Sequence, residues 1–258
     1  MYTNRYIFIY SIVMVVVVAA ILSSAASFLR PIQEENERTE KMSQILSSVK
    51  IEADKDNAQE LYDKYIVREE AINMEGEVVS VYENGQQVKG DLRPFRLNLR
   101  EELYKERQIR AGKGGEEPRF PVYICNKNNE TYYIVPLYGK GLWGPLWGDI
   151  ALEDDLNTVY GVTFGHKSET PGLGAEINTL AFQEQFYGKM IFENEVEFTS
   201  IEVVKGGVEV MPEDRRIHGV DAISGGTITS NGVTDMLKDC LGNYLDYFKK
   251  LKNNGRSS

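Results

Sequence analysis

The residues best suited to chemistry form a run of glycines and hydroxyls at positions 221–230, directly before a long apolar-periodic segment. Gly225 and Gly226 let the backbone adopt positive φ and let another group approach closely. The hydroxyl side chains can cap the following helix, whose first N–H groups attract an anion. These hydroxyls belong to Ser224, Thr227, Thr229 and Ser230. The run therefore predicts either a capped turn or a phosphate-sized polar site at a loop-to-helix junction.

A second glycine-rich run, at positions 139–148, holds both tryptophans of the chain, Trp143 and Trp147, with Leu142 beside the first. Large flat rings on a mobile backbone suit a stacking surface for a planar ligand or a partner protein. A bend between two strands, with both indoles buried, would have the same composition.

A third loop candidate spans positions 166–176. A proline and glycines fix a tight turn at the end of a strand, and polar side chains stand at its mouth. The residues concerned are Glu169, Thr170, Pro171, Gly172, Leu173 and Gly174.

Several classes of function find no support in the sequence. The net charge of −10 and the pI near 4.9 exclude a basic nucleic-acid surface. His166 and His218 lack motif-spaced partners, so hydrolase, kinase and metal-site patterns are missing, and we expect each histidine to be structural or solvent-facing. Cys125 and Cys240 form no CxxC pair, and are either a disulfide or two buried thiols. Glycine-rich loops without acid–base machinery indicate a bound cofactor that supplies the chemistry.

The N-terminal segment predicts a membrane span. Tyr6 to Leu29 carries no charged residue. At 1.5 Å per residue this run reaches about 36 Å, enough to cross a bilayer core of about 30 Å. The apolar run is longer than a usual signal-peptide core, so we expect a retained anchor rather than a cleaved leader. Arg5 precedes the span and Arg30 follows it, so the positive charges on its two sides nearly balance and do not fix the orientation. The long C-terminal domain favours the N-in, C-out orientation.

The rest of the chain predicts an α+β fold, with a mixed or antiparallel sheet and packed helices behind one N-terminal transmembrane helix. Residues 1–30 are the leader and anchor, 31–75 a helical stalk or packing region, and 76–258 the extracytoplasmic domain. Helices are expected at 34–63, 57–72, 180–190 and 230–251, and a charged surface loop at 100–118. Strands are expected near 79–88 (a hairpin with an Asn84-Gly85 turn), 120–125, 131–138, 149–152, 159–164 and 198–204.

Asp221, Ser224, Gly225, Gly226 and Thr227 together resemble the flavinylation motif Asp-x-x-(Ser/Thr)-Gly-Ala-Thr. This motif marks the FMN-binding domain family that is shared by the NqrC component of the Na⁺-translocating NADH:quinone reductase and the RnfG component of the related Rnf complex. Glycine replaces the usual alanine at position 226, which adds backbone freedom and removes no reacting group. The N-terminal span and the two other loops resemble the same family, in the same order.

The resemblance implies a covalent FMN. A separate flavin transferase would join the FMN phosphate to the hydroxyl of Thr227, with Thr229 as the alternative. By carry-over of position, the loop residues would lie against the flavin, and no catalytic side chain or metal ligand is implied. These expected cofactor-binding residues are Asp221, Ser224, Gly225, Gly226, Thr227, Thr229, Leu142, Trp143, Glu169, Thr170, Gly172 and Leu173.

The resemblance also implies a role in electron transfer. The chain would pass single electrons between other subunits of a sodium-exporting complex in the bacterial inner membrane, with its bulk on the periplasmic side. NADH oxidation and quinone reduction would take place on partner subunits. Two alternatives stay open: an RnfG-type component that relays electrons between ferredoxin and NAD, and an anchored non-redox sensor or assembly domain. The long charged region at 34–115 favours the quinone-reductase component.

Overall fold

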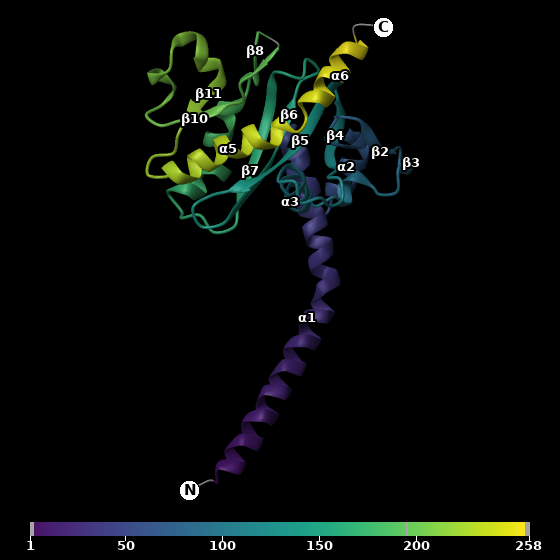
Figure 1. The fold of residues 1–258 in the computed structure, drawn as a ribbon, viewed down its shortest axis with the longest axis vertical. Helices are drawn as coiled ribbons and strands as arrows, with labels where there is room; N and C mark the ends of the chain where they lie inside the picture. Colours follow the sequence, from purple (N-terminus) through teal and green to yellow (C-terminus); the bar gives the residue numbers. More distant parts are fainter. Residues whose placement is uncertain (1–2, 195, 256–258) are drawn as a thin grey trace. The chain divides into compact units, whose positions relative to one another are not determined.

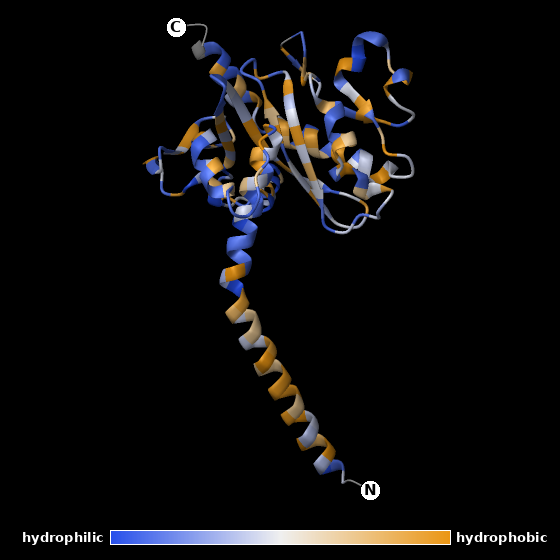
Figure 2. Ribbon diagram, turned by 180° about the vertical axis from the view of Figure 1, so that it is seen from behind, coloured by the Kyte–Doolittle hydropathy of each residue, from blue (hydrophilic) through white to orange (hydrophobic). Residues whose placement is uncertain are grey.

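The computed structural model describes residues 3–194 and 196–255, so positions 1–2, 195 and 256–258 of the expected domain ranges lie outside the described residues. The chain divides into two compact units, Met1–Met42 and Ser43–Ser258. Helix α1 (Asn4–Ser48) runs without a break through Pro31. Its N-terminal part is apolar (Figure 2), and it is the candidate membrane span within the described part of the chain.

The second unit is built on a seven-stranded sheet whose neighbouring strands are all antiparallel (Figure 1). Its spatial order is β3 (Gln86–Lys89), β2 (Val78–Glu83), β1 (Ile66–Ile72), β4 (Phe120–Lys127), β5 (Glu130–Lys140), β6 (Pro145–Leu152) and β7 (Val159–His166). Tight turns join the strands where the expected hairpins lie: Asn84 has φ +51° and Gly85 φ +78°, while Asn128 and Asn129 have φ +56° and +67°. The predicted α+β class with an antiparallel sheet is confirmed.

Two small pairs complete the strands. β8 (Phe192–Glu193) and β9 (Glu197–Phe198) are antiparallel, and β10 (Glu202–Val204) and β11 (Gly219–Asp221) are parallel. Ser200, at φ +65°, lies between β9 and β10, so the strand expected at 198–204 is interrupted. Short 3₁₀ turns lie along the chain: η1 (Pro94–Arg96), η2 (Gly174–Asn178) and η3 (Glu184–Phe186), with η4 (Val208–Val210) and η5 (Glu213–His218) between β10 and β11.

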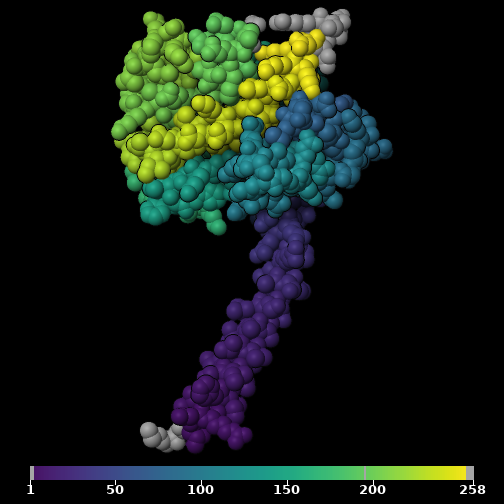
Figure 3. Space-filling view, viewed as in Figure 1, coloured from purple at the N-terminus to yellow at the C-terminus, as the bar shows by residue number. Residues whose placement is uncertain are grey.

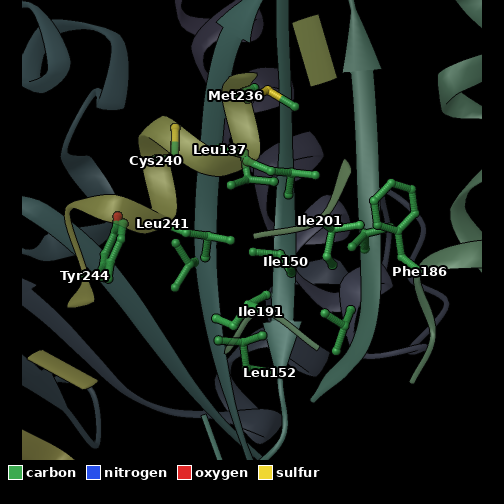
Figure 4. Close-up of a cluster of buried hydrophobic side chains, with 14 of the residues drawn as sticks. Leu137, Ile150, Leu152, Phe186, Ile191, Ile201, Met236, Cys240, Leu241 and Tyr244 are labelled. Atoms are coloured by element: carbon green, nitrogen blue, oxygen red, sulfur yellow. The ribbon is translucent and has the colours of Figure 1, made fainter. Parts of the chain in front are cut away.

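Helices lie on both faces of the sheet. α5 (Thr227–Gly242) crosses β5 and β6 and continues into α6 (Leu245–Gly255), forming the yellow band of Figure 3. Met236 and Leu241 point from α5 onto Leu137 and its neighbours (Figure 4), and Leu237 belongs to the same buried cluster. On the opposite face, Tyr62 of α2 (Ala58–Tyr65) contacts Phe95, which contacts Tyr123 of β4. Each fully buried leucine in such a core contributes about 1.5–3 kcal/mol.

Five expected helices and loops were wrong in extent or type. The helix expected at 34–63 ends with α1 at Ser48, and a turn and coil follow before α2. The helix expected at 57–72 ends at Tyr65, and Ile66–Ile72 form the central strand β1, because its charged residues find buried partners from distant segments. The loop expected at 100–118 begins as helix α3 (Leu99–Arg110), which Asn98 caps by accepting from the Arg100 N–H.

The other two corrections concern helix lengths. The helix expected at 180–190 is a short α4 (Leu180–Gln183) followed by η3, and it ends at Phe186. The helix expected at 230–251 begins earlier, at Thr227, and is broken between Gly242 and Leu245. That break turns Tyr244 inward, where it is fully buried and its hydroxyl donates to the Pro121 carbonyl at 3.1 Å.

Candidate functional site

The glycine–hydroxyl run forms the turn that starts α5. Gly225 has φ +73°, and the Gly226 N–H donates to the Ile223 carbonyl at 3.0 Å, which closes the turn. Gly226 is the N-cap residue, and no side chain caps the helix, so the expected hydroxyl cap was wrong. Ser230 instead accepts from the Ile223 N–H at 3.3 Å. The first N–H groups of α5 are therefore left without a capping side chain and favour an anion.

The two candidate acceptor threonines differ in their hydrogen bonding. Thr229 is 2% exposed, and its hydroxyl donates to Glu169 Oε2 at 2.6 Å. Thr227, the first residue of α5, is half-buried, and no residue within 3–194 and 196–255 hydrogen-bonds its hydroxyl. Thr227 therefore offers a free hydroxyl beside the uncapped N–H groups, whereas the hydroxyl of Thr229 is already bound.

Glu169 joins the three predicted loops. Its side chain is 5% exposed, Oε1 accepts from the Trp143 N–H at 2.9 Å, and Oε2 accepts from Thr229. Its own N–H donates to His166 Nδ1 at 3.2 Å. The structure thus places Glu169 inside the protein with both carboxylate oxygens engaged, rather than at an open mouth.

The loop with Leu142 and Trp143 reverses tightly between β5 and β6. The Gly141 N–H donates to the Gly144 carbonyl at 2.8 Å, and the Ser168 hydroxyl donates to the Trp143 carbonyl at 3.1 Å. Trp143 is 64% exposed and Leu142 46% exposed. This geometry leaves the Trp143 indole available for stacking on a planar ligand.

Trp147 does not share that surface. It lies on β6, half-buried, opposite Gly165 of β7, and the indole fills the space that a Cβ at Gly165 would need. The structure therefore separates the two tryptophans into one exposed ring and one packed ring.

The remaining loop folds around the Thr170 carbonyl, which accepts from the N–H groups of Leu173 and Ala175, both at 3.1 Å. Gly172 has φ +75° and donates its N–H to Glu176 Oε1 at 2.9 Å. Leu173 is 41% exposed and lies over the α5 turn: a Cβ built on Gly225 would be 2.6 Å from Leu173 Cδ2. The loop thus contacts the segment that carries the two candidate acceptor threonines.

Asp221, at the end of β11, holds a neighbouring loop. Its Oδ1 accepts from the Val208 N–H at 2.7 Å, and its N–H donates to Gln185 Oε1 at 2.8 Å. Ser224 is exposed at the turn. The structure therefore brings the expected residues together on three loops, while Asp221 is tied to a fourth segment.

Sequence reasoning missed two contacts of the site. His166 accepts the Glu169 N–H, and its position three residues earlier at a strand end is a spacing typical of such side-chain-to-backbone bonds. The contact of Leu173 with Gly225 had no local signal, since the two residues are far apart in sequence. His218 is buried, with Nδ1 2.7 Å from the Met190 carbonyl oxygen.

The thiols lie outside the site. Cys125 and Cys240 are both free and buried, so the disulfide alternative was wrong. Burial raises the pKa of each thiol to about 12. The Tyr138 N–H donates to Cys240 Sγ at 3.3 Å, directly behind the strand that leads into the Trp143 loop. Among the described residues, no group of His, Cys, Asp and Glu side chains could hold a metal ion.

Comparisons with known proteins identify the family of this chain. The FMN-binding domain family matches residues 141–242, which include the three loops. The chain is 35% identical over 231 residues to the NqrC component of the Na(+)-translocating NADH-quinone reductase of Vibrio alginolyticus, covering 88% of this chain and 86% of that protein.

Solved structures show the same fold. A crystal structure of the corresponding Na(+)-translocating NADH-quinone reductase component from Parabacteroides distasonis matches with a TM-score of 0.69 and 37% identity, covering 85% of this chain and 96% of that one. The NqrC structure from Shewanella oneidensis matches with a TM-score of 0.64 and 25% identity, covering 84% and 99%. The chain belongs to the NqrC family, the FMN-binding component of the Na(+)-translocating NADH-quinone reductase, an oxidoreductase complex.

Proposed function

We propose that this chain carries one FMN, joined through its phosphate to the Thr227 hydroxyl, and relays single electrons between partner subunits of a sodium-exporting NADH:quinone reductase. The observation that carries the proposal is the free Thr227 hydroxyl at the uncapped start of α5, next to a Thr229 whose hydroxyl is bound to Glu169.

The local electrostatics favour the phosphate at Thr227. The first N–H groups of α5 lack a capping side chain, and they carry the positive end of the helix dipole. The closely approachable backbone at Gly225 and Gly226 leaves room for phosphate oxygens beside these donors. The site therefore fits a phosphoester without any metal ion.

The attachment reaction balances with FAD as the donor and a separate flavin transferase as the enzyme. The Thr227 oxygen forms a new bond to the phosphorus of the FMN half, the pyrophosphate bond of FAD breaks, and AMP leaves. The hydroxyl proton is released, and no oxidation or reduction takes place. Once attached, FMN supplies the redox chemistry, and this chain holds and orients it.

The exposed apolar side chains around the turn would cover the ring system. Trp143, Leu142, Leu173 and Ile228 are each more than 40% exposed and come from the three loops that meet at this turn. Stacking on Trp143 and contact with Leu173 would hold the isoalloxazine while one edge stays open for electron transfer.

We place the chain in the bacterial inner membrane through residues 1–30, followed by a stalk or packing region at 31–75 and the flavin domain at 76–258 on the periplasmic side. The apolar helix supports the anchor, and the length of the C-terminal domain supports the orientation. NADH oxidation and quinone reduction are assigned to other subunits.

The test is the intact mass of the full chain purified from native membranes, where the transferase is present, followed by peptide mapping. The expected result is a gain of FMN minus water on the peptide with Thr227. The variant Thr227→Ala should lose the adduct and keep its fold, and Thr234→Ala, on the same helix, should keep the adduct.

Two outcomes would overturn this assignment. An adduct retained in Thr227→Ala would move the attachment to Thr229. An unmodified wild-type chain from native membranes would leave an anchored non-redox domain as the better account. Sodium-dependent quinone reduction by the purified complex separates this function from that of an RnfG-type component.

A further inference from the structure

The carboxylate of Glu169 lies at the one point where the Trp143 loop, the loop after β7 and the first turn of α5 all meet. Oε1 accepts from the Trp143 backbone N–H at 2.9 Å, and Oε2 accepts from the Thr229 hydroxyl at 2.6 Å. Both Glu169 and Thr229 are at least nine-tenths buried, so water cannot replace either partner without opening the loops.

Two glycines make room for this carboxylate. A Cβ on Gly141 would be 2.5 Å from Glu169 Oε1, and a Cβ on Gly174 would be 2.6 Å from Oε2 and would overlap the Thr229 hydroxyl. Neither glycine has positive φ, so the missing side chain serves the close approach rather than the backbone conformation. The loops are therefore built around the Glu169–Thr229 contact.

We propose that Glu169 and Thr229 form a positioning pair that fixes the distance between the ring end and the phosphate end of the flavin site. The proposal rests on the proposed attachment of FMN at Thr227. Thr227 and Thr229 share the first turn of α5, and Trp143 carries the exposed ring on the other side of Glu169. A buried hydrogen-bonded path thus runs from the first turn of α5 through the Glu169 carboxylate to the Trp143 loop.

The pair acts through the groups that it holds and does not contact the reacting atoms. Replacing the Thr229 hydroxyl with a methyl group would leave Glu169 Oε2 without its donor in a buried place. The carboxylate would then turn toward water and release the Trp143 N–H. We expect the Trp143 loop to move away from α5, which would expose the flavin ring.

The experiment compares the full chain with Thr229→Val, which keeps the shape, and Thr229→Ser, which keeps the hydroxyl. Thr234→Val is the matched control on the same helix, because its hydroxyl accepts from the Val203 N–H at 2.9 Å and donates to the Ser230 carbonyl at 3.3 Å rather than to Glu169. The measurements are covalent FMN by intact mass, quenching of flavin fluorescence by iodide, the flavin midpoint potential and hydrogen exchange at the Trp143 amide.

For Thr229→Val we expect faster exchange at the Trp143 amide, by about 2- to 10-fold, together with stronger iodide quenching and a shifted midpoint potential. Thr229→Ser should restore wild-type values, and Thr234→Val should change none of them even where it lowers the melting temperature. A loss of stability alone cannot produce this pattern.

The two proposals fail in different ways. If Thr229→Val shows the same iodide quenching, midpoint potential and Trp143 amide exchange as the wild type, the positioning pair is overturned, while the proposed FMN attachment stands. Absence of FMN from the wild-type chain would overturn the attachment and, with it, the role of the pair toward flavin. Amide exchange measured on Thr227→Ala, with and without Thr229→Val, reports the Glu169 contact without any flavin.

Discussion

The carboxylate of Asp221 accepts a hydrogen bond from the Val208 backbone N–H at 2.7 Å, across thirteen residues of chain. Asp221 therefore hydrogen-bonds η4 to the end of β11, and its own N–H donates to Gln185 Oε1. Asp221, the first residue of the proposed attachment motif, therefore also holds the surface near Thr227 in place.

Asp221→Ala should lower the free energy of unfolding by about 1–2 kcal/mol, because the Val208 N–H loses a charged acceptor. For a unit of this size the melting temperature should fall by about 2–4 °C per kcal/mol. Asp221→Asn keeps an acceptor oxygen and should lie close to the wild type in thermal unfolding. Equal melting temperatures for the alanine and asparagine variants would show that the bond to Val208 does not stabilise the fold.

Gly225→Ala should destabilise the turn more than Gly172→Ala does. Both glycines have φ near +75°, so alanine brings similar backbone strain of about 1–3 kcal/mol at each. Only at Gly225 would the new Cβ meet a neighbour, Leu173 Cδ2 at 2.6 Å, whereas nothing lies within 4 Å at Gly172.

Urea unfolding of the two glycine variants isolates this contact. We expect Gly225→Ala to cost about 0.5–1.5 kcal/mol beyond Gly172→Ala, because the exposed Leu173 side chain must leave its rotamer to avoid the new Cβ. Adding Leu173→Ala to Gly225→Ala should recover part of that difference. The predicted contact between the loop and α5 is wrong if the two single variants unfold at the same urea concentration.

Much of the sheet could be predicted because the sequence patterns that indicate its strands and turns are local. β4 to β7 carry short apolar runs, and asparagine-rich turns at Asn84 and Asn128 adopt the positive φ that hairpins need. β1 escaped prediction because Glu69 is stabilised by Arg93 and Tyr62, partners that lie on other elements. No window of local sequence contains that information.

The same distinction between local and long-range information applies to the site. The three loops were recognisable from their glycines, prolines and aromatic residues, since those residue types report local backbone needs. The bond from Thr229 to Glu169 joins residues sixty positions apart. Only the fold shows that one of the two candidate threonines already has a hydrogen-bond partner.

Glu169→Ala should leave Thr227 available for attachment but loosen the Trp143 loop. The Trp143 N–H and the buried Thr229 hydroxyl would both lose their acceptor, which costs about 1–3 kcal/mol for the buried hydroxyl. A redox titration of the flavinylated variant should show a shifted midpoint potential. Glu169→Gln, with one acceptor oxygen left, should give an intermediate shift. An unchanged flavin midpoint potential in Glu169→Ala would show that Glu169 does not influence the flavin ring.

Stability should fall at alkaline pH because the two thiols are buried. Burial raises the pKa of Cys125 and Cys240 from 9.0 to about 12, so above pH 9 the unfolded chain releases thiol protons that the folded chain retains. The unfolded state then binds fewer protons, and the free energy of unfolding decreases by about 1.4 kcal/mol per pH unit for each thiol. The loss begins near pH 9 and levels off near pH 12. Cys125→Ala/Cys240→Ala should flatten the slope of urea stability between about pH 9 and 10, where the buried tyrosines contribute less. An identical slope in both proteins would mean that the thiols do not govern the alkaline transition.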